Sequence, residues 1–401
     1  MKKWTIPKTA SILLVVMLFL AQVLVAEASS LGKGPPNKPA EWTFMVYIDG
    51  DNSLDAYVVP DIETELAPTG SNADVSVVVL ADRAETADWA QTLLFYVTQG
   101  MQATPENAVD DWGEANMGDP QTLIDFIAWT KANYPAKHYA LSFWNHGWSW
   151  RPGSSMADET DEDTLDQHEI EAALEAAGAI DVIMYDACQM ATIENEATVR
   201  AYSQAIVHSQ EWVNWDGIEY ELVIPALHED PTMSPEELAI VVNQSAAINK
   251  ELTGSAVALN ADWDALIAAV DNWAIALQGG LPAYRTEIWA AFHNTQSFVQ
   301  DITAKDLYDL AYNVGSRITN EEIYGPTQAV MDAVDAVILD EWHATKYHGA
   351  HGISIFAPTR VRDLDSSWTT EWNDFEYYQN ELVFSEMTNW DEFLDEFVNG
   401  E

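Results

Sequence analysis

A succession of short apolar runs in the first half of the chain constrains the fold more than any other feature. Each run is bounded by turn residues, and together they occupy 43–49, 74–82, 91–99, 137–147, 179–187 and 204–210. Helical patterns lie between several of them, notably at 119–133, 167–177 and 189–203. Nearly continuous apolar strands that alternate with helices predict a mostly parallel sheet covered by helices on both faces. The sequence therefore predicts an α/β fold.

The second half of the chain is more helical than the first. Helical patterns cover 234–249, 262–278, 303–316 and 326–341, and one further strand is predicted at 352–358. We predict an α/β core at 42–210, followed by a helical elaboration at 211–401 that returns this strand. The pattern leaves open whether 211–401 is a separate domain or packs on the same sheet.

The N-terminus has the form of an export signal. Lys2, Lys3 and Lys8 precede an apolar run from about Ala10 to Ala26, and Ala26-Glu27-Ala28 matches a cleavage site. We predict a cleaved signal peptide at 1–28, with an uncleaved membrane anchor as the alternative. A Gly/Pro/Lys-rich leader follows at 29–41. The predicted location is extracellular or in the cell envelope, with no membrane segment after signal removal.

The charge excludes several classes of partner. The formal net charge is −48, so nucleic acid and anionic membranes are poor partners for this surface. Such acidity is also typical of disordered chains, but 48% hydrophobic residues and 17 Trp favour a folded core instead. High salt would screen the repulsion among these negative charges, so the composition favours a halophilic protein. Nothing in the pattern indicates an oligomeric state.

Two residues with nucleophilic chemistry end two of the predicted strands. His146 lies in the Asn-His-Gly end of the run at 137–147, Cys188 follows the run at 179–187, and each is expected just past the carboxyl end of a strand. One strand–helix–strand unit separates them, so the strands are expected to be neighbours. An imidazole beside a thiol favours the nucleophilic thiolate. The alternative is an inert core cysteine and a turn histidine, because Cys188 is the single cysteine and cannot form an internal disulfide.

Backbone groups next to this pair suit an oxyanion. Gly147 carries no side chain, so its amide can approach a substrate. Cys188 is expected to open a helix, whose N-terminal amides favour developing negative charge.

Several blocks of the chain resemble the clostripain family of cysteine peptidases, which has a caspase-like fold. The blocks are NHG at 145–147, DVIMYDACQMA at 181–191, MVYIDGDNSLD at 45–55, GISIFAP at 352–358 and TNWDEFL at 388–394. The resemblance spans 42–396. It implies protein or peptide substrates, with His146 as general base and Cys188 as nucleophile. The amides of Gly147 and Cys188 would form the oxyanion hole.

The resemblance also implies cleavage after basic residues. Asp186 stands at the position that determines the S1 pocket in the family, and Asp216 resembles a later acidic residue near the same pocket. A buried carboxylate pairs well with guanidinium. The alternative for Asp186 is a helix N-cap. The chain departs from the family at Trp148 and Trp150, which are expected to narrow the cleft or form a subsite.

No metal-ligand set and no certain cofactor are predicted, but the resemblance leaves calcium open because some members need it. Residues 49–55 carry Asp at alternate positions yet lack the glycine and distal glutamate of an EF-hand. Helix capping by Asp51 or Asn52 is the favoured explanation. The acidic run at 158–166 is expected to be a solvated loop.

Two other functions compete with a peptidase that cleaves after Arg or Lys. One is a caspase-like module that binds peptides or cell-envelope components without catalysis. The other is a peptidase of the same fold with a different P1 preference.

Overall fold

The structure, a computed structural model, describes residues 38–153, 155–215, 217–246, 252–298, 303–364 and 374–400. These described residues form one compact unit. The predicted signal peptide at 1–28 lies outside the described residues, as does most of the predicted leader at 29–41. The first strand begins at Ala40, so the last two residues of that leader belong to the strand.

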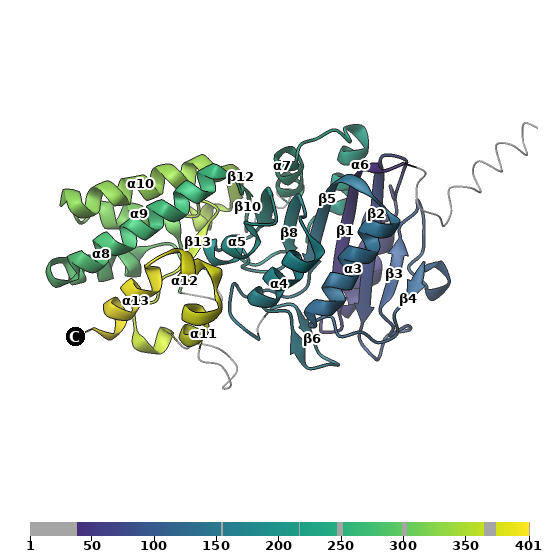
Figure 1. Ribbon diagram of the computed structural model, residues 1–401, viewed down its shortest axis with the longest axis horizontal. Helices are drawn as coiled ribbons and strands as arrows, with labels where there is room; N and C mark the ends of the chain where they lie inside the picture. Colours follow the sequence, from purple (N-terminus) through teal and green to yellow (C-terminus); the bar gives the residue numbers. More distant parts are fainter. Residues whose placement is uncertain are drawn as a thin grey trace, which may run out of the picture. The chain divides into compact units, whose positions relative to one another are not determined.

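Within the described residues, nine strands form one sheet in the order β12-β10-β9-β8-β5-β1-β2-β3-β4 (Figure 1). Their bounds are β1 (Ala40–Gly50), β2 (Val75–Arg83), β3 (Leu93–Tyr96), β4 (Asp110–Asp111), β5 (Ala136–Trp144), β8 (Val182–Asp186), β9 (Ala205–His208), β10 (Thr253–Ala258) and β12 (Ile338–His343). The five central strands, from β2 to β9, are parallel, and the outer pairings are antiparallel. The predicted α/β class with a mostly parallel sheet is therefore confirmed.

Helices cover both faces of this sheet because its strands are apolar on both sides. The helices are α2 (Asp55–Pro60), α3 (Pro120–Asn133), α4 (Gln167–Ala177), α5 (Ile193–Val199), α6 (Tyr220–Glu229), α7 (Pro235–Ala246), α8 (Ala261–Asn294), α9 (Leu307–Gly315), α10 (Glu321–Val337), α11 (Asp374–Glu381), α12 (Val383–Met387) and α13 (Trp390–Asn399). Along β1, Phe44 and Val46 pack with α2, α6 and α7, whereas Met45 and Tyr47 pack with α3, α4 and α5. Because successive side chains of a strand point to opposite faces, the sheet separates two hydrophobic cores.

Helix boundaries in the first half follow capping chemistry that the sequence displays. The side chain of Asp119 accepts a hydrogen bond from the Gln121 amide at the start of α3. At the start of α4, Asp166 and Glu169 form a reciprocal capping box. These local signals explain why the predicted bounds of both helices agree with the structure.

The second half contributes two strands to the main sheet that the pattern does not predict. β10 reads TGSAVA, in which Thr253 and Val257 favour a strand but the glycine and the two alanines do not, so the run gives no clear strand signal. Its Gly254 leaves no room for a side chain, because a Cβ there would collide with Trp342 and Asn243. The helix predicted at 326–341 ends at Val337, and β12 begins at the next residue.

The strand predicted at 352–358 is shorter than expected and does not join the main sheet. It is β13 (Ser354–Phe356), which pairs with β11 (Ala304–Asp306). The prediction of a helix at 303–316 is therefore wrong at its start, where the residues form β11, and the helix α9 begins only after that strand. A second small pair, β6 (Ala157–Asp158) and β7 (Asp163–Thr164), lies between β5 and α4 in the chain.

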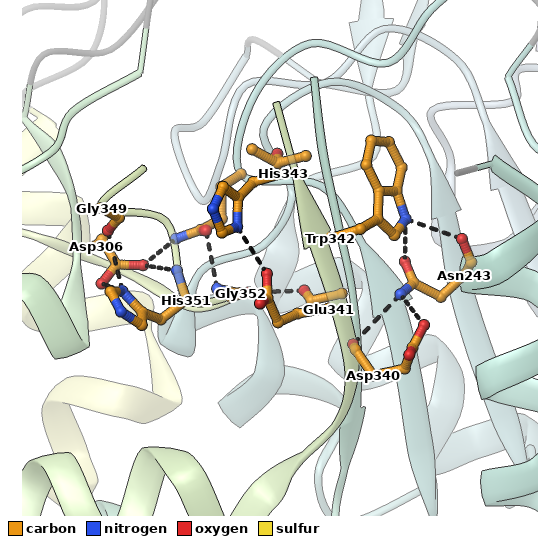
Figure 2. Close-up of polar contacts among 12 residues, drawn as sticks. Asn243, Asp306, Asp340, Glu341, Trp342, His343, Gly349, His351 and Gly352 are labelled. Atoms are coloured by element: carbon orange, nitrogen blue, oxygen red, sulfur yellow. Dashed lines mark hydrogen bonds and ion pairs between the residues drawn. The ribbon is translucent and has the colours of Figure 1, made fainter. Parts of the chain in front are cut away.

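Side-chain hydrogen bonds anchor β12 and the segment before β13 (Figure 2). The Nδ2 of Asn243 on α7 donates to the Asp340 carboxylate at 2.9 Å, and the Trp342 indole donates to the Asn243 backbone oxygen at 2.9 Å. The His351 ring contacts the Asp306 carboxylate through Nδ1, 3.1 Å from Oδ1. β12 is thus held by α7, and the segment before β13 by β11.

Candidate active site

His146 and Cys188 lie at the tips of neighbouring strands. β5 pairs with β8 in parallel, with Trp144 opposite Asp186, so each residue of the pair lies two positions beyond its strand. Both line one cavity of about 340 Å³. The predicted adjacency of the two strands is therefore confirmed, and the imidazole and the thiol face a common space.

Glycine at position 147 permits the two loops to approach. A Cβ at Gly147 would collide with the backbone oxygen of Cys188 and come within 3.0 Å of the Ala187 side chain. Any larger residue would push the His146 and Cys188 loops apart. Gly147 is thus required for the geometry, whatever its amide does in catalysis.

The prediction that Cys188 opens a helix is wrong. Gln189 adopts a left-handed conformation with φ of 58°, and α5 begins only at Ile193. Its N-cap is Thr192, whose side chain accepts from the Asn195 amide. The Cys188 thiol therefore lies outside the first turn of α5, and Asp186 is not the helix cap that the alternative required.

The His146 ring is positioned by a turn at the carboxyl end of β1. Its Nε2 lies 2.8 Å from the Ser53 hydroxyl oxygen. The preceding residue, Asn145, donates from Nδ2 to Asp49 at 2.6 Å and accepts a hydrogen bond from Asn52 at 3.2 Å. Burial lowers the pKa of His146, so the ring is neutral near pH 7 and able to accept a proton.

The Cys188 thiol is partly buried and has one backbone donor. Its Sγ accepts a hydrogen bond from the Val213 amide at 3.4 Å. Burial raises the pKa of Cys188, and the negative charges of Glu211 and Asp186 raise it further. The resting thiol is therefore protonated, and a nucleophilic role requires a base such as His146 to remove the proton.

Asp186 lies in the same cavity and is held by two donors. Its Oδ2 accepts from the Tyr220 hydroxyl at 2.9 Å, and its Oδ1 accepts from the Ile218 amide at 3.1 Å. Gly217 crosses directly over the carboxylate, where a Cβ would collide with Oδ1. Burial raises the pKa of Asp186 to about 6, so the group is mostly ionised above that pH. The other predicted acidic residue, Asp216, lies outside the described residues.

Aromatic side chains that the sequence did not single out form one wall of the cavity. Trp215 is 66% exposed and stacks on Tyr57, with ring centroids 5.4 Å apart. Trp212, also exposed, lines the same cavity. Trp150, in contrast, is buried against Phe356 and Tyr378, so its predicted role in the cleft is wrong. Segments distant in sequence supply this wall, which is why no local pattern indicated it.

The two acidic stretches at 49–55 and 158–166 come together behind the His146 loop. Asp51, Asp82, Glu114 and Asp158 each offer a carboxylate oxygen, and these oxygens lie within 4.8 Å of one another. Asp158 is 1% exposed, so the expectation of a solvated loop is wrong at this residue. Asn52 closes the turn before α2 by accepting from the Leu54 amide. The four carboxylates could hold a cation.

Among the described residues, no helix combines the length and the apolar character needed to cross a membrane.

The sequence model described as Clostripain family matches residues 46–397. The chain is 30% identical over 191 residues to clostripain of Hathewaya histolytica, and the match covers 40% of this chain and 36% of that protein. The chain thus spans about a third of the length of the curated relative that it matches.

Two solved structures share the fold. One is a secreted C11 cysteine protease from Bacteroides thetaiotaomicron in complex with an irreversible peptide inhibitor. Its TM-score is 0.63 at 16% identity, covering 88% of this chain and 100% of that chain. The other is an inactive zymogen C11 protease from Parabacteroides distasonis, with a TM-score of 0.66 at 18% identity, covering 88% and 99%. These similarities confirm the predicted caspase-like fold.

Proposed function

The chain belongs to the clostripain family, and from that premise we propose that it is a cysteine endopeptidase that cleaves peptide bonds after Arg or Lys. Cys188 is the nucleophile, His146 is its general base, and Asp186 binds the basic P1 side chain. The observation that carries the proposal is that all three residues line one cavity.

The covalent step uses the proton of the thiol. His146 accepts that proton, and the Cys188 sulfur attacks the carbonyl carbon of the scissile bond. The amides of Gly147 and Cys188 stabilise the oxyanion that forms. When the C–N bond breaks, His146 returns the proton to the leaving amine and a thioester remains.

Hydrolysis of the thioester regenerates the enzyme. His146 removes a proton from a water molecule, and the resulting hydroxide attacks the thioester carbonyl carbon. The C–S bond breaks, the sulfur takes the proton back from His146, and a carboxylic acid leaves. One water is consumed for each bond cut, so no redox partner is needed.

Charge in the cavity supports a basic P1 side chain. Asp186 is buried and, among the described residues, accepts hydrogen bonds from Tyr220 and Ile218, whereas a carboxylate has room for about four. The free lone pairs suit the parallel N–H groups of a guanidinium. The exposed faces of Trp212 and Trp215 would cover the apolar stem of such a side chain.

Export of the mature chain is also proposed, on the basis of the signal-like pattern at 1–28. N-terminal sequencing of protein recovered outside the cell tests it. A mature chain that begins near Ser29 supports export with cleavage, whereas a chain that keeps Met1 and stays with the membrane supports the anchor.

The test of the specificity is a fluorogenic peptide panel that differs only in the P1 residue, with Arg, Lys, Asn and Asp. Cys188→Ala protein is the control for contaminating peptidases. Turnover confined to Arg and Lys supports the proposal. Turnover confined to Asn or Asp would favour the competing P1 preference, and no turnover by folded wild-type protein would favour a binding module.

A further inference from the structure

The loop at 188–191, which carries the thiol, lies between two segments that are distant in sequence. On one side, the Ala191 amide donates to the Ser209 backbone oxygen at 2.9 Å. On the other side, the Ala191 backbone oxygen accepts from the Ser354 amide at 2.9 Å. The position of this loop therefore depends on the spacing between the segment after β9 and the start of β13.

The segment at 209–213, which follows β9, also reaches the thiol itself. The Gln189 amide donates to the Glu211 backbone oxygen at 3.0 Å. The Val213 amide donates to the Cys188 sulfur at 3.4 Å. Because α5 begins only after this loop, such contacts with neighbouring segments position the sulfur.

The side chain of Gln210, which is 2% exposed, joins the two flanking segments. Its Oε1 accepts from the Gly352 amide at 3.0 Å. Its Nε2 donates to the Ser354 hydroxyl oxygen at 2.9 Å and to Asp306 Oδ2 at 3.0 Å. Both N–H groups of the side-chain amide are thus used. Since a backbone amide can only donate, the Gly352 contact fixes which end of the Gln210 amide is the oxygen.

Asp306 is a fixed acceptor for this side chain because other donors hold it in place. It is fully buried at the end of β11. Its Oδ1 accepts from the Asp309 amide at 2.8 Å, and its Oδ2 accepts from the His351 amide at 2.6 Å. His351 Nδ1 lies 3.1 Å from Asp306 Oδ1 and 3.1 Å from the Gly349 backbone oxygen, so this nitrogen carries a hydrogen (Figure 2). The carboxylate that Gln210 meets cannot rotate without breaking these bonds.

We propose that Gln210 is a positioning residue for the nucleophile, because it joins the segment at 209–213 to the start of β13 and so fixes the loop between them. The inference rests on the proposed function, in which Cys188 attacks the scissile carbonyl. The effect of Gln210 on catalysis passes through the backbone of the loop. A misplacement of about 1 Å can lower a rate about 100-fold, so a small shift of the sulfur is enough.

Steady-state kinetics of Gln210→Met tests the proposal. Methionine keeps the length of glutamine but cannot donate a hydrogen bond to Asp306 or Ser354. With an Arg peptide, kcat should fall at least about tenfold, while KM should change less than about threefold. KM should be kept because Asp186, the proposed P1 partner, is held by Tyr220 and Ile218 and not by this connection.

A matched control removes a buried amide of the same kind elsewhere. Asn243 is 1% exposed, and its Nδ2 also donates to a carboxylate, that of Asp340 (Figure 2). Asn243→Leu keeps the shape of the side chain and should lower the melting temperature, but it should leave kcat within about twofold of the wild type. Unchanged kcat in Gln210→Met would overturn the proposal. So would an equal loss of kcat in Asn243→Leu, since that result would indicate a general effect of stability.

Gln210→Glu gives a pH signature that loss of packing does not predict. The new carboxylate would face Asp306, with His351 and Asp309 behind it. Two carboxylates about 3 Å apart repel unless they share a proton. The kcat of Gln210→Glu relative to the wild type should therefore rise as pH falls from about 8 to about 5, because a shared proton restores the hydrogen bond. A flat ratio over this range would contradict the proposal.

Hydrogen exchange tests the connection without any dependence on activity. The Gln189 and Ala191 amides donate to the segment after β9, so a peptide that covers 187–192 should exchange faster in Gln210→Met than in the wild type. Asn243→Leu should leave its exchange unchanged. Equal exchange in the wild type and Gln210→Met would overturn the proposal. If folded wild-type protein cuts no peptide, the proposed function fails, and this measurement alone decides the role of Gln210.

A milder variant keeps the test if Gln210→Met does not fold. Ser354→Ala removes only the hydroxyl that accepts from Gln210. It should lower kcat and speed exchange at 187–192 in the same directions, to a smaller extent. Wild-type values of both quantities in Ser354→Ala would then overturn the proposal.

Discussion

Asp186→Asn should separate substrate selectivity from stability. Burial raises the pKa of Asp186 from 3.8 to about 6, and at about 1.36 kcal/mol per pH unit the ionised group costs the folded state about 3 kcal/mol above pH 6. Asparagine removes this cost, and its amide can still accept from the Ile218 amide and donate to the Tyr220 oxygen. The free energy of unfolding at pH 7.5 should therefore stay level or rise.

Cleavage after Arg should fall in the same variant. Removal of one partner of a buried ion pair costs about 2 to 5 kcal/mol, which is at least about 30-fold in kcat/KM. The matched substrates carry Arg or citrulline at P1, because citrulline has the shape of arginine without the charge. We expect a large Arg-to-citrulline ratio of kcat/KM for the wild type and a ratio near one for Asp186→Asn.

Two results would refute this reasoning. Equal losses for the arginine and citrulline substrates would make Asp186 a structural residue and not a P1 determinant. A large drop in the free energy of unfolding, measured by urea titration at the same pH, would show that the carboxylate stabilises the fold and that the predicted burial cost is wrong.

The other predictions concern the dyad, processing, salt and pH. Cys188→Ala and His146→Ala should each abolish turnover without unfolding the protein, and the double variant should lose no more than either, as steady-state kinetics and circular dichroism would show. The active chain should stay uncut between His146 and Cys188. Arg151 is the single Arg or Lys in this segment after which the enzyme could cut, but it precedes Pro152 and is buried in an ion pair with Asp374. Intact-mass analysis that finds a break between His146 and Cys188 would contradict this prediction. Melting temperature should rise between about 0.1 M and about 2 M NaCl, because salt screens the net charge of −48; a flat or falling value would contradict the halophilic expectation. Burial raises the pKa of Glu194 to about 7, so between about pH 5 and pH 7 the folded protein keeps a proton on this group that the unfolded chain releases. The free energy of unfolding should therefore fall as pH rises from about 5 to about 7.5. A denaturant midpoint that rises over that range would contradict this prediction.

The parallel centre of the sheet was predictable because each of its strands carries its own signal. Runs such as 74–82 and 179–187 are apolar, bounded by turns and buried on both faces, so local composition reflects the final environment. β10 and β12 carry no such signal. In β10, Gly254 packs against Trp342, 88 residues later in the chain, and no local pattern contains that contact.

In the candidate site, too, some contacts could be predicted from the sequence and others could not. His146 and Cys188 could be paired from the sequence because both follow strands of one strand–helix–strand unit. The contact of Ser53 with His146, and the convergence of Asp82 and Glu114, depend on how distant strand ends meet. The prediction of a helix directly after Cys188 is wrong because the loop turns at Gln189, which has a positive φ, before α5 begins. A loop of that kind has no fixed sequence signature.

The most direct test of the central claim is covalent labelling with a peptide chloromethyl ketone that carries Arg at P1, followed by peptide mapping. We predict a single adduct at Cys188, formed much more slowly in His146→Ala, and lost in Asp186→Asn while iodoacetamide still alkylates the thiol. An adduct on any other residue, or equal labelling rates in the wild type and His146→Ala, would contradict the account.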